Sequence, residues 1–156
     1  MKKKVAINGF GRIGRLVYRA FLERSNEFSH QYEIAYINDL ADIDTNIHLL
    51  KYDSIHGPLS KEINKISNEQ FSIDENKVTV TSERNPIDLN WSDKNVDIIL
   101  ECTGVFASKD KAMSHVESGA SKVIVSAPCS GADITVVQGV NNKNINLDHQ
   151  VISNAS

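Results

Sequence analysis

The sequence has few cysteines and no long apolar run. Cys102 and Cys129 are the only cysteines among 156 residues, too few for a disulfide scaffold or a cysteine-based metal cluster. No stretch approaches the roughly 18 consecutive apolar residues that span a bilayer. The lysines of residues 1–4 could begin a secretory signal, but Asn8 and Arg12 interrupt the apolar stretch that follows them. We therefore expect a cytoplasmic protein with no membrane partner.

A strong excess of one charge is also missing. The net charge is −3 at pH 7, which provides no broad basic field for nucleic acid or for an anionic membrane. The histidines are scattered without metal-ligand spacing, so we expect no metal site. They are His30, His48, His56, His115 and His149. We expect them to be surface or packing residues, with His56 as a loop residue that could hold local structure.

What the chain does contain is a series of short apolar runs separated by helical patterns. Apolar residues make up 40% of the sequence, enough for one core, and we predict a single domain over residues 1–156. The pattern predicts helices over 13–24, 43–50 and 110–117. Strands are expected at 4–8, 33–38, 96–103, 122–128, 133–140 and 150–154, and residues 58–82 alternate like short antiparallel strands inserted at one edge. The fold class is therefore α/β, with a doubly wound, mainly parallel sheet and a short antiparallel insertion in the middle.

Three glycines follow the first predicted strand and open the first predicted helix. Gly9, Gly11 and Gly14 have the spacing G-x-G-x-x-G, and Asp39 ends the next strand. This is the complete Rossmann arrangement for binding a dinucleotide. Gly9 would allow the tight turn, Gly11 the close approach of a pyrophosphate, and Gly14 close packing of helix on strand. The alternative is a structural glycine turn in which Asp39 caps the strand end.

The same segment bears on the choice of cofactor. Free amides near Arg12 and Ile13 would face the phosphates, and Asp39 would accept hydrogen bonds from the ribose hydroxyls of the adenosine. A carboxylate at this position repels a 2′-phosphate, and Leu40 offers no positive charge to receive one. We therefore predict NAD rather than NADP.

Seven short segments together resemble a known family. They are INGFGRIGR (7–15), IND (37–39), LLKYDSIHG (49–57), ERNP (83–86), ECTGVF (101–106), VSAP (125–128) and SNAS (153–156). Their order and content closely resemble the cofactor domain of phosphorylating glyceraldehyde-3-phosphate dehydrogenase, from end to end of the chain. The resemblance implies NAD as cofactor, glyceraldehyde 3-phosphate and phosphate as substrates, and a homotetramer for the whole enzyme.

The resemblance also implies a set of cofactor-binding positions. Arg12 and Ile13 would bind the pyrophosphate and Asp39 the adenosine ribose. The main chain of Arg84 would meet the adenine, although Arg84 could equally be a solvated loop arginine, and Ser126 would lie near the nicotinamide ribose. The full set is Asn8, Gly9, Gly11, Arg12, Ile13, Gly14, Asn38, Asp39, Arg84, Thr103, Gly104 and Ser126.

No catalytic residue is expected within the chain. In the family, the SNAS segment is followed at once by the catalytic cysteine, so the nucleophile would follow Ser156 and the catalytic domain is absent from this chain. Cys102 is predicted to lie inside an apolar strand as an inert residue, and Cys129 lies in a predicted loop without a histidine partner.

Two other interpretations stay open at this stage. One is erythrose-4-phosphate dehydrogenase, which shares the fold and the chemistry. The other is a stand-alone module that binds NAD without catalysis. The family also packs a C-terminal helix and a second domain on the cofactor domain. Without them we expect exposed apolar surface, weaker cofactor affinity and some association.

Overall fold

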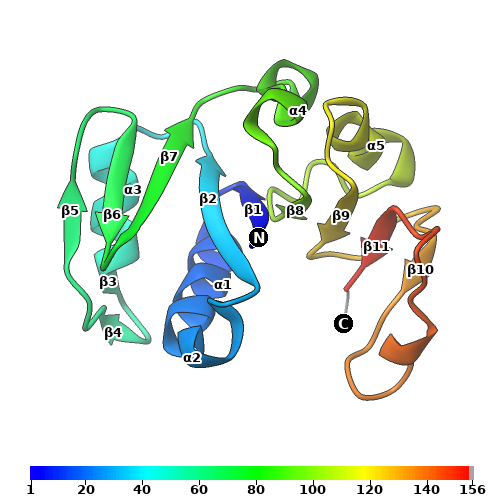
Figure 1. Ribbon diagram of the computed structural model, residues 1–156, viewed down its shortest axis with the longest axis horizontal. Coiled ribbons are helices and arrows are strands. Elements are labelled where there is room, and N and C mark those ends of the chain that lie inside the picture. The colour runs from blue at the N-terminus through cyan, green and yellow to red at the C-terminus, as the bar shows by residue number, and fades with distance from the viewer. Residues whose placement is uncertain (155–156) are drawn as a thin grey trace.

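The structure, a computed structural model that describes residues 1–154, is built on one large β-sheet (Figure 1). Its nine strands have the order β10-β11-β9-β8-β1-β2-β7-β6-β5. The pairing of β5 with β6 and the pairing of β6 with β7 are antiparallel. Every other pairing in this sheet is parallel. The strands are β1 (Lys3–Asn8), β2 (Tyr32–Asn38), β5 (Ile63–Lys65), β6 (Gln70–Ile73), β7 (Asn76–Thr81), β8 (Ile98–Glu101), β9 (Lys122–Val125), β10 (Ile134–Thr135) and β11 (Val151–Ser153).

Helices cover both faces of the sheet. They are α1 (Arg12–Glu23), α2 (Ser25–Phe28), α3 (Ile43–Lys51), α4 (Trp91–Lys94) and α5 (Lys109–Glu117), with 3-10 turns η1 (Pro86–Leu89) and η2 (Asn142–Asn144). A separate two-stranded sheet pairs β3 (Tyr52–Asp53) with β4 (Gly57–Pro58).

The period of two along β1 divides the core into two halves. Ile7 packs with Tyr18 of α1, in a cluster that we call the α1-side core; it also contains Leu50 of α3. Ala6 packs with Trp91 and with Ala112 of α5, in the α5-side core. Because successive strand residues point to opposite faces, both faces of the central strands are buried.

Polar groups fix the ends of α3. The Asp42 carboxylate accepts a 2.7 Å hydrogen bond from the Thr45 N–H at the helix start. At the other end the buried Arg19 guanidinium donates to the carbonyls of Leu50 and Lys51 at 2.7 and 3.0 Å. These carbonyls have no partner within the helix, so Arg19 of α1 ties the two helices together.

The predicted α/β class with its mainly parallel sheet is confirmed, and three details are corrected. The last strand of the middle segment, β7, joins the main sheet parallel to β2. Cys102 follows β8 rather than lying inside it. The strand predicted at 133–140 is only Ile134–Thr135, because the Asn141 and Asn142 side chains accept the N–H groups of Val137 and Gly139 and turn the chain away from the sheet.

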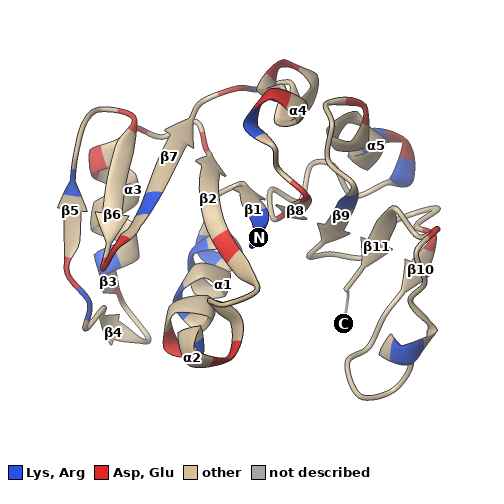
Figure 2. Cartoon of the chain, viewed as in Figure 1, with Lys and Arg blue, Asp and Glu red and all other residues tan. Residues whose placement is uncertain are grey.

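Charged side chains are distributed over all parts of the structure. Figure 2 shows Lys and Arg interspersed with Asp and Glu on helices, strands and loops. Within residues 1–154 no helix is both long enough and apolar enough to cross a membrane.

Candidate functional site

A cleft of about 450 Å³ lies beyond the carboxyl ends of β1, β2 and β8. The chain runs from β1 to β2 on one side and later returns to β8 on the other, and open α/β sheets bind ligands where the strand order reverses in this way. The cleft is lined by Asn8, Gly9, Gly11, Asn38, Asp39, Leu40, Glu83, Arg84, Thr103, Val105 and Phe106.

The glycine turn lies at the cleft. It is tightly packed at Gly9 and Gly14, and it has open space at Gly11. Gly9 has φ +88°, and a Cβ there would lie 2.7 Å from Cγ2 of Thr103. A Cβ on Gly14 would lie 2.2 Å from the Gly9 carbonyl oxygen, whereas a Cβ on Gly11 would meet nothing within 4 Å. The open space at Gly11 therefore fits a pyrophosphate group brought against the main chain.

The start of α1 adds hydrogen-bond donors to this opening. Gly11 is the N-cap, no side chain caps the helix, and its first turn holds no acidic residue. The N–H groups of Arg12 and Ile13 therefore lack helical partners and can bind an anion. Their side chains lie outside the cleft lining; Arg12 Nη2 is 3.8 Å from Asp53 Oδ1.

The Asp39 carboxylate bridges two turns at the cleft. One oxygen accepts the Phe10 N–H at 2.9 Å and the other accepts the Ala41 N–H at 3.0 Å. Each oxygen keeps acceptor capacity for a ligand hydroxyl. Leu40, half exposed beside it, adds an apolar wall.

Two buried asparagine amides support the floor. Asn38 donates to Asn8 Oδ1 at 2.8 Å and to the Glu83 carbonyl at 2.8 Å. Its own oxygen accepts the Glu83 N–H and the Thr81 hydroxyl, both at 2.8 Å. Asn8 and Asn38 therefore hold in place the loop that carries Arg84.

Other predicted residues lie at the margin or outside. Thr103 lines the cleft, but Gly104 (φ +76°) lies in an exposed turn beside it and Ser126 is set back, with its N–H bonded to the Glu101 carbonyl at 3.0 Å. Leu40, Glu83, Val105 and Phe106 line the cleft without having been predicted as site residues.

Neither cysteine is prepared for nucleophilic chemistry. Burial raises the pKa of Cys102 to about 11 despite a hydrogen bond to Ser126, and burial also raises the pKa of Cys129. Both thiols are thus protonated near neutral pH. The nucleophile expected after Ser156 lies outside the described residues, as do the last two positions of the SNAS segment.

The loop that carries His56, a residue that could hold local structure, is held by the Asp53 carboxylate. The Asp53 carboxylate accepts the N–H groups of Ile55 and His56 at 2.9 and 2.8 Å. The backbone bonds from His56 and Ile55, aided by the charge of Arg12, lower the pKa of Asp53. No group of three or more potential metal-ligating side chains gathers among residues 1–154.

Comparison with known proteins agrees with this geometry. The family model described as "Glyceraldehyde 3-phosphate dehydrogenase, NAD binding domain" matches residues 3–109. The whole chain is 47% identical to the glyceraldehyde-3-phosphate dehydrogenase of Xanthobacter flavus and 45% identical to that of Cereibacter sphaeroides, and 98% of it is 46% identical to that of Thermotoga maritima. It spans 45% of the length of each of these relatives. The chain belongs to the family of NAD-binding domains of glyceraldehyde-3-phosphate dehydrogenase.

Proposed function

We propose that this chain binds NAD⁺ in the cleft beside Gly11 and is the cofactor-binding part of a phosphorylating glyceraldehyde-3-phosphate dehydrogenase. The observation that carries the proposal is the glycine turn, which is closed beneath Gly9 and Gly14 and open at Gly11. A side chain at Gly11 would occupy the space that the pyrophosphate needs.

We assign a group in or beside the cleft to each part of the cofactor. The amides of Arg12 and Ile13 would hold the pyrophosphate, the Asp39 carboxylate would hold the adenosine ribose, and the main chain of Arg84 would meet the adenine. Thr103, with Gly104 in the exposed turn beside it, would lie on the side of the nicotinamide, and Ser126, which is set back from the cleft, would lie near the nicotinamide ribose. When bound, the nicotinamide supplies the hydride acceptor for aldehyde oxidation.

The reaction of the whole enzyme uses residues beyond this chain. The raised pKa values of Cys102 and Cys129 make these two thiols poorly suited to act as the nucleophile. As the family resemblance implies, we expect the nucleophile to be a cysteine that follows Ser156 in a homotetrameric cytoplasmic enzyme. That cysteine would attack glyceraldehyde 3-phosphate, and after oxidation phosphate would release the acyl group from sulfur as an acyl phosphate. The chain alone binds the cofactor without catalysis.

Calorimetric titration of the 156-residue chain with NAD⁺ and with NADP⁺ tests the cofactor site. We expect saturable NAD⁺ binding and NADP⁺ binding at least about tenfold weaker, because the Asp39 carboxylate would face a 2′-phosphate. The nearly isosteric Asp39→Asn variant removes that charge and should narrow the difference between the two cofactors. Equal affinity for both cofactors in the wild type, or binding of neither, would contradict the proposal.

A further inference from the structure

Resting on the NAD⁺ site proposed above, we propose that Glu101 is a positioning residue for that site and that Trp91 controls it through the tautomer of His115. Glu101 ends β8, and His115 lies on α5, which packs against the neighbouring strand β9. Their side chains are 1% and 0% exposed, and neither lines the cleft.

The Glu101 carboxylate is surrounded by hydrogen-bond donors. Oε2 accepts from Asn8 Nδ2 and from His115 Nε2, each at 2.7 Å. Oε1 accepts from the Thr103 N–H at 3.0 Å and from the Thr103 hydroxyl. Two bonds to each oxygen use the full acceptor capacity of an ionised carboxylate.

Trp91 decides which nitrogen of His115 carries the proton. The indole N–H can only donate, and Trp91 Nε1 lies 3.1 Å from His115 Nδ1. Nδ1 must therefore accept, and the ring proton of the neutral imidazole is on Nε2, directed at Glu101. The contact of 3.3 Å between Asn8 Nδ2 and His115 Nε2 then joins two donors, both of which serve the same Glu101 oxygen.

This arrangement keeps Glu101 ionised although it is buried. Burial alone would raise the pKa of Glu101, but hydrogen bonds from His115, Asn8 and Thr103 outweigh it and hold that pKa below its ordinary value. A protonated carboxyl group would need an acceptor here, and of the groups that face it only the Thr103 hydroxyl could accept, whereas Asn8 Nδ2, His115 Nε2 and the Thr103 N–H are donors. A buried anion with every bond made is tolerated, whereas removing one partner leaves a costly orphan.

The groups that Glu101 orients are parts of the cofactor cleft. Asn8 and Thr103 both line it, and the Thr103 hydroxyl, held by Glu101, accepts the Val105 N–H at 3.1 Å. Through Asn8 the chain of bonds continues to Asn38 and the loop that carries Arg84. Glu101 thus fixes both walls of the cleft from beneath without touching the ligand.

The test uses two variants of the 156-residue chain, Glu101→Gln and Trp91→Phe, each titrated with NAD⁺ and melted without it. The glutamine presents an N–H₂ group to donors, and the phenylalanine removes the donor that selects the His115 tautomer. We expect each variant to raise the Kd for NAD⁺ by about tenfold or more. The control is Met113→Leu, a repacking of α5 in the same half-core, which should stay within about twofold of the wild type.

Nitrogen NMR of His115 supplies a readout that a purely structural role would not change. We expect the Nε2–H tautomer in the wild type and in Met113→Leu, and a mixture of tautomers in Trp91→Phe. If Glu101→Gln fails to fold, the NAD⁺ affinity of Trp91→Phe and the NMR spectra of His115 test the proposal without it. A folded Glu101→Gln or Trp91→Phe chain with wild-type affinity, or a wild-type Nδ1–H tautomer, overturns the proposal. A wild-type chain that binds no NAD⁺ overturns instead the proposed function on which it rests.

Discussion

Gly9, Gly11 and Gly14 belong to one motif but meet different surroundings. Gly9 is required by its positive φ, and Gly14 by its contact with the Gly9 carbonyl. Gly11 has φ −75° and open space around its Cα, so the folded chain itself accepts a side chain there. In the proposed function it is the ligand that requires glycine at that position.

Substituting these glycines by alanine should therefore separate folding from binding. Gly14→Ala forces the α1 turn away from β1 and should lower the free energy of unfolding by about 1–3 kcal/mol, with loss of NAD⁺ binding. Gly11→Ala should keep the wild-type free energy of unfolding and still lose most of its NAD⁺ affinity. Urea denaturation and calorimetry measure the two quantities, and a Gly11→Ala chain that binds NAD⁺ normally would contradict the assigned role.

At the scale of elements, the spacing of apolar residues correctly predicts the helices and strands that have one face buried along their whole length. The helix α1 and the strands β1 and β2 agree with their predicted ranges to within one or two residues, since apolar spacing alone decides them. The strand predicted over 133–140 fails because asparagine side chains compete for the backbone, an effect that apolar spacing does not contain.

The glycine turn of the site is predictable from sequence, but its support is not. The motif prescribes backbone geometry within a few neighbouring residues. Glu101 and His115 instead lie on a strand and a helix that are brought together by tertiary packing. The available signal is the acidic residue that ends the otherwise apolar strand IILE (98–101), because such a charge needs buried partners.

One ion pair at the element scale has a defined pH dependence. Asp133 binds Lys109 at the start of α5 and accepts the N–H groups of Gln150 and Val151 at 2.9 Å before β11. The hydrogen bond from Lys109, the bond from Val151 and the further bond from Gln150 lower the pKa of Asp133 from 3.8 to about 2. This carboxylate therefore contributes stability above pH 4, and the contribution is lost as the pH falls towards 2.

Asp133→Asn should reveal that contribution in urea denaturation between pH 6 and pH 2.5. At pH 6 we expect the variant to be less stable than the wild type by about 1 kcal/mol. Below about pH 4 the difference in free energy of unfolding should shrink as Asp133 becomes protonated in the wild type. A difference that stays constant over this range would show that Asp133 is not the titrating group.

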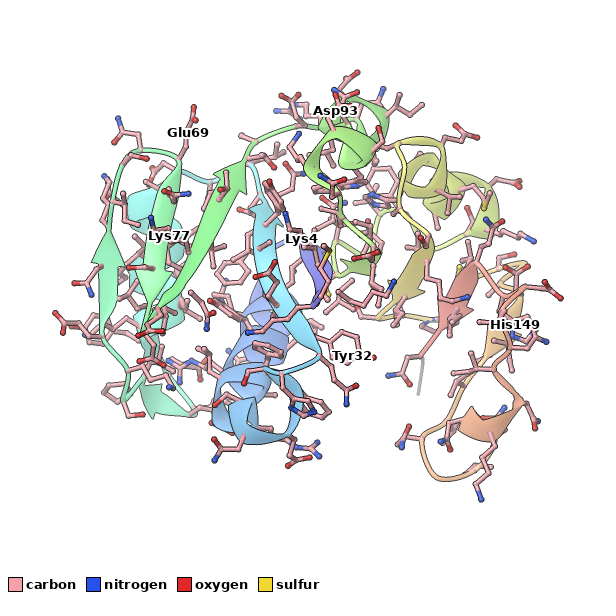
Figure 3. The ribbon with its side chains drawn as sticks, viewed as in Figure 1. Lys4, Tyr32, Glu69, Lys77, Asp93 and His149 are labelled. Atoms are coloured by element: carbon pink, nitrogen blue, oxygen red, sulfur yellow. The ribbon has the colours of Figure 1, made fainter. Side chains whose placement is uncertain are left out.

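On the scale of the whole molecule, one face of the sheet is incompletely covered. A hollow of about 220 Å³ lies beside α1, over strands β1, β8 and β9, and its lining is almost wholly apolar. Phe21 of α1, Leu100 of β8 and Ile124 of β9 contribute to it, as does Tyr32, which Figure 3 labels at the start of β2. Exposed apolar surface of this kind favours association.

We therefore expect the 156-residue chain to associate as its concentration rises. Sedimentation velocity at increasing concentration measures this, and Ile124→Thr, which keeps a β-branched residue in β9, should reduce it. Leu147→Thr is the matched control, because Leu147 is 92% exposed but lies away from the hollow. A strictly monomeric wild type, or equal effects of the two variants, would contradict this expectation.

The position of Trp91 also determines what an optical unfolding experiment observes. It is the only tryptophan of the chain and lies entirely within the α5-side core, whereas the buried aromatic residues of the α1-side core are Tyr18, Phe10 and Phe71. Its fluorescence therefore reports on one half of the interior, while far-ultraviolet circular dichroism averages over both. If the two halves of the core unfold at different temperatures, the melting curves from fluorescence and from circular dichroism diverge. The order of the two transitions then identifies the half that unfolds first.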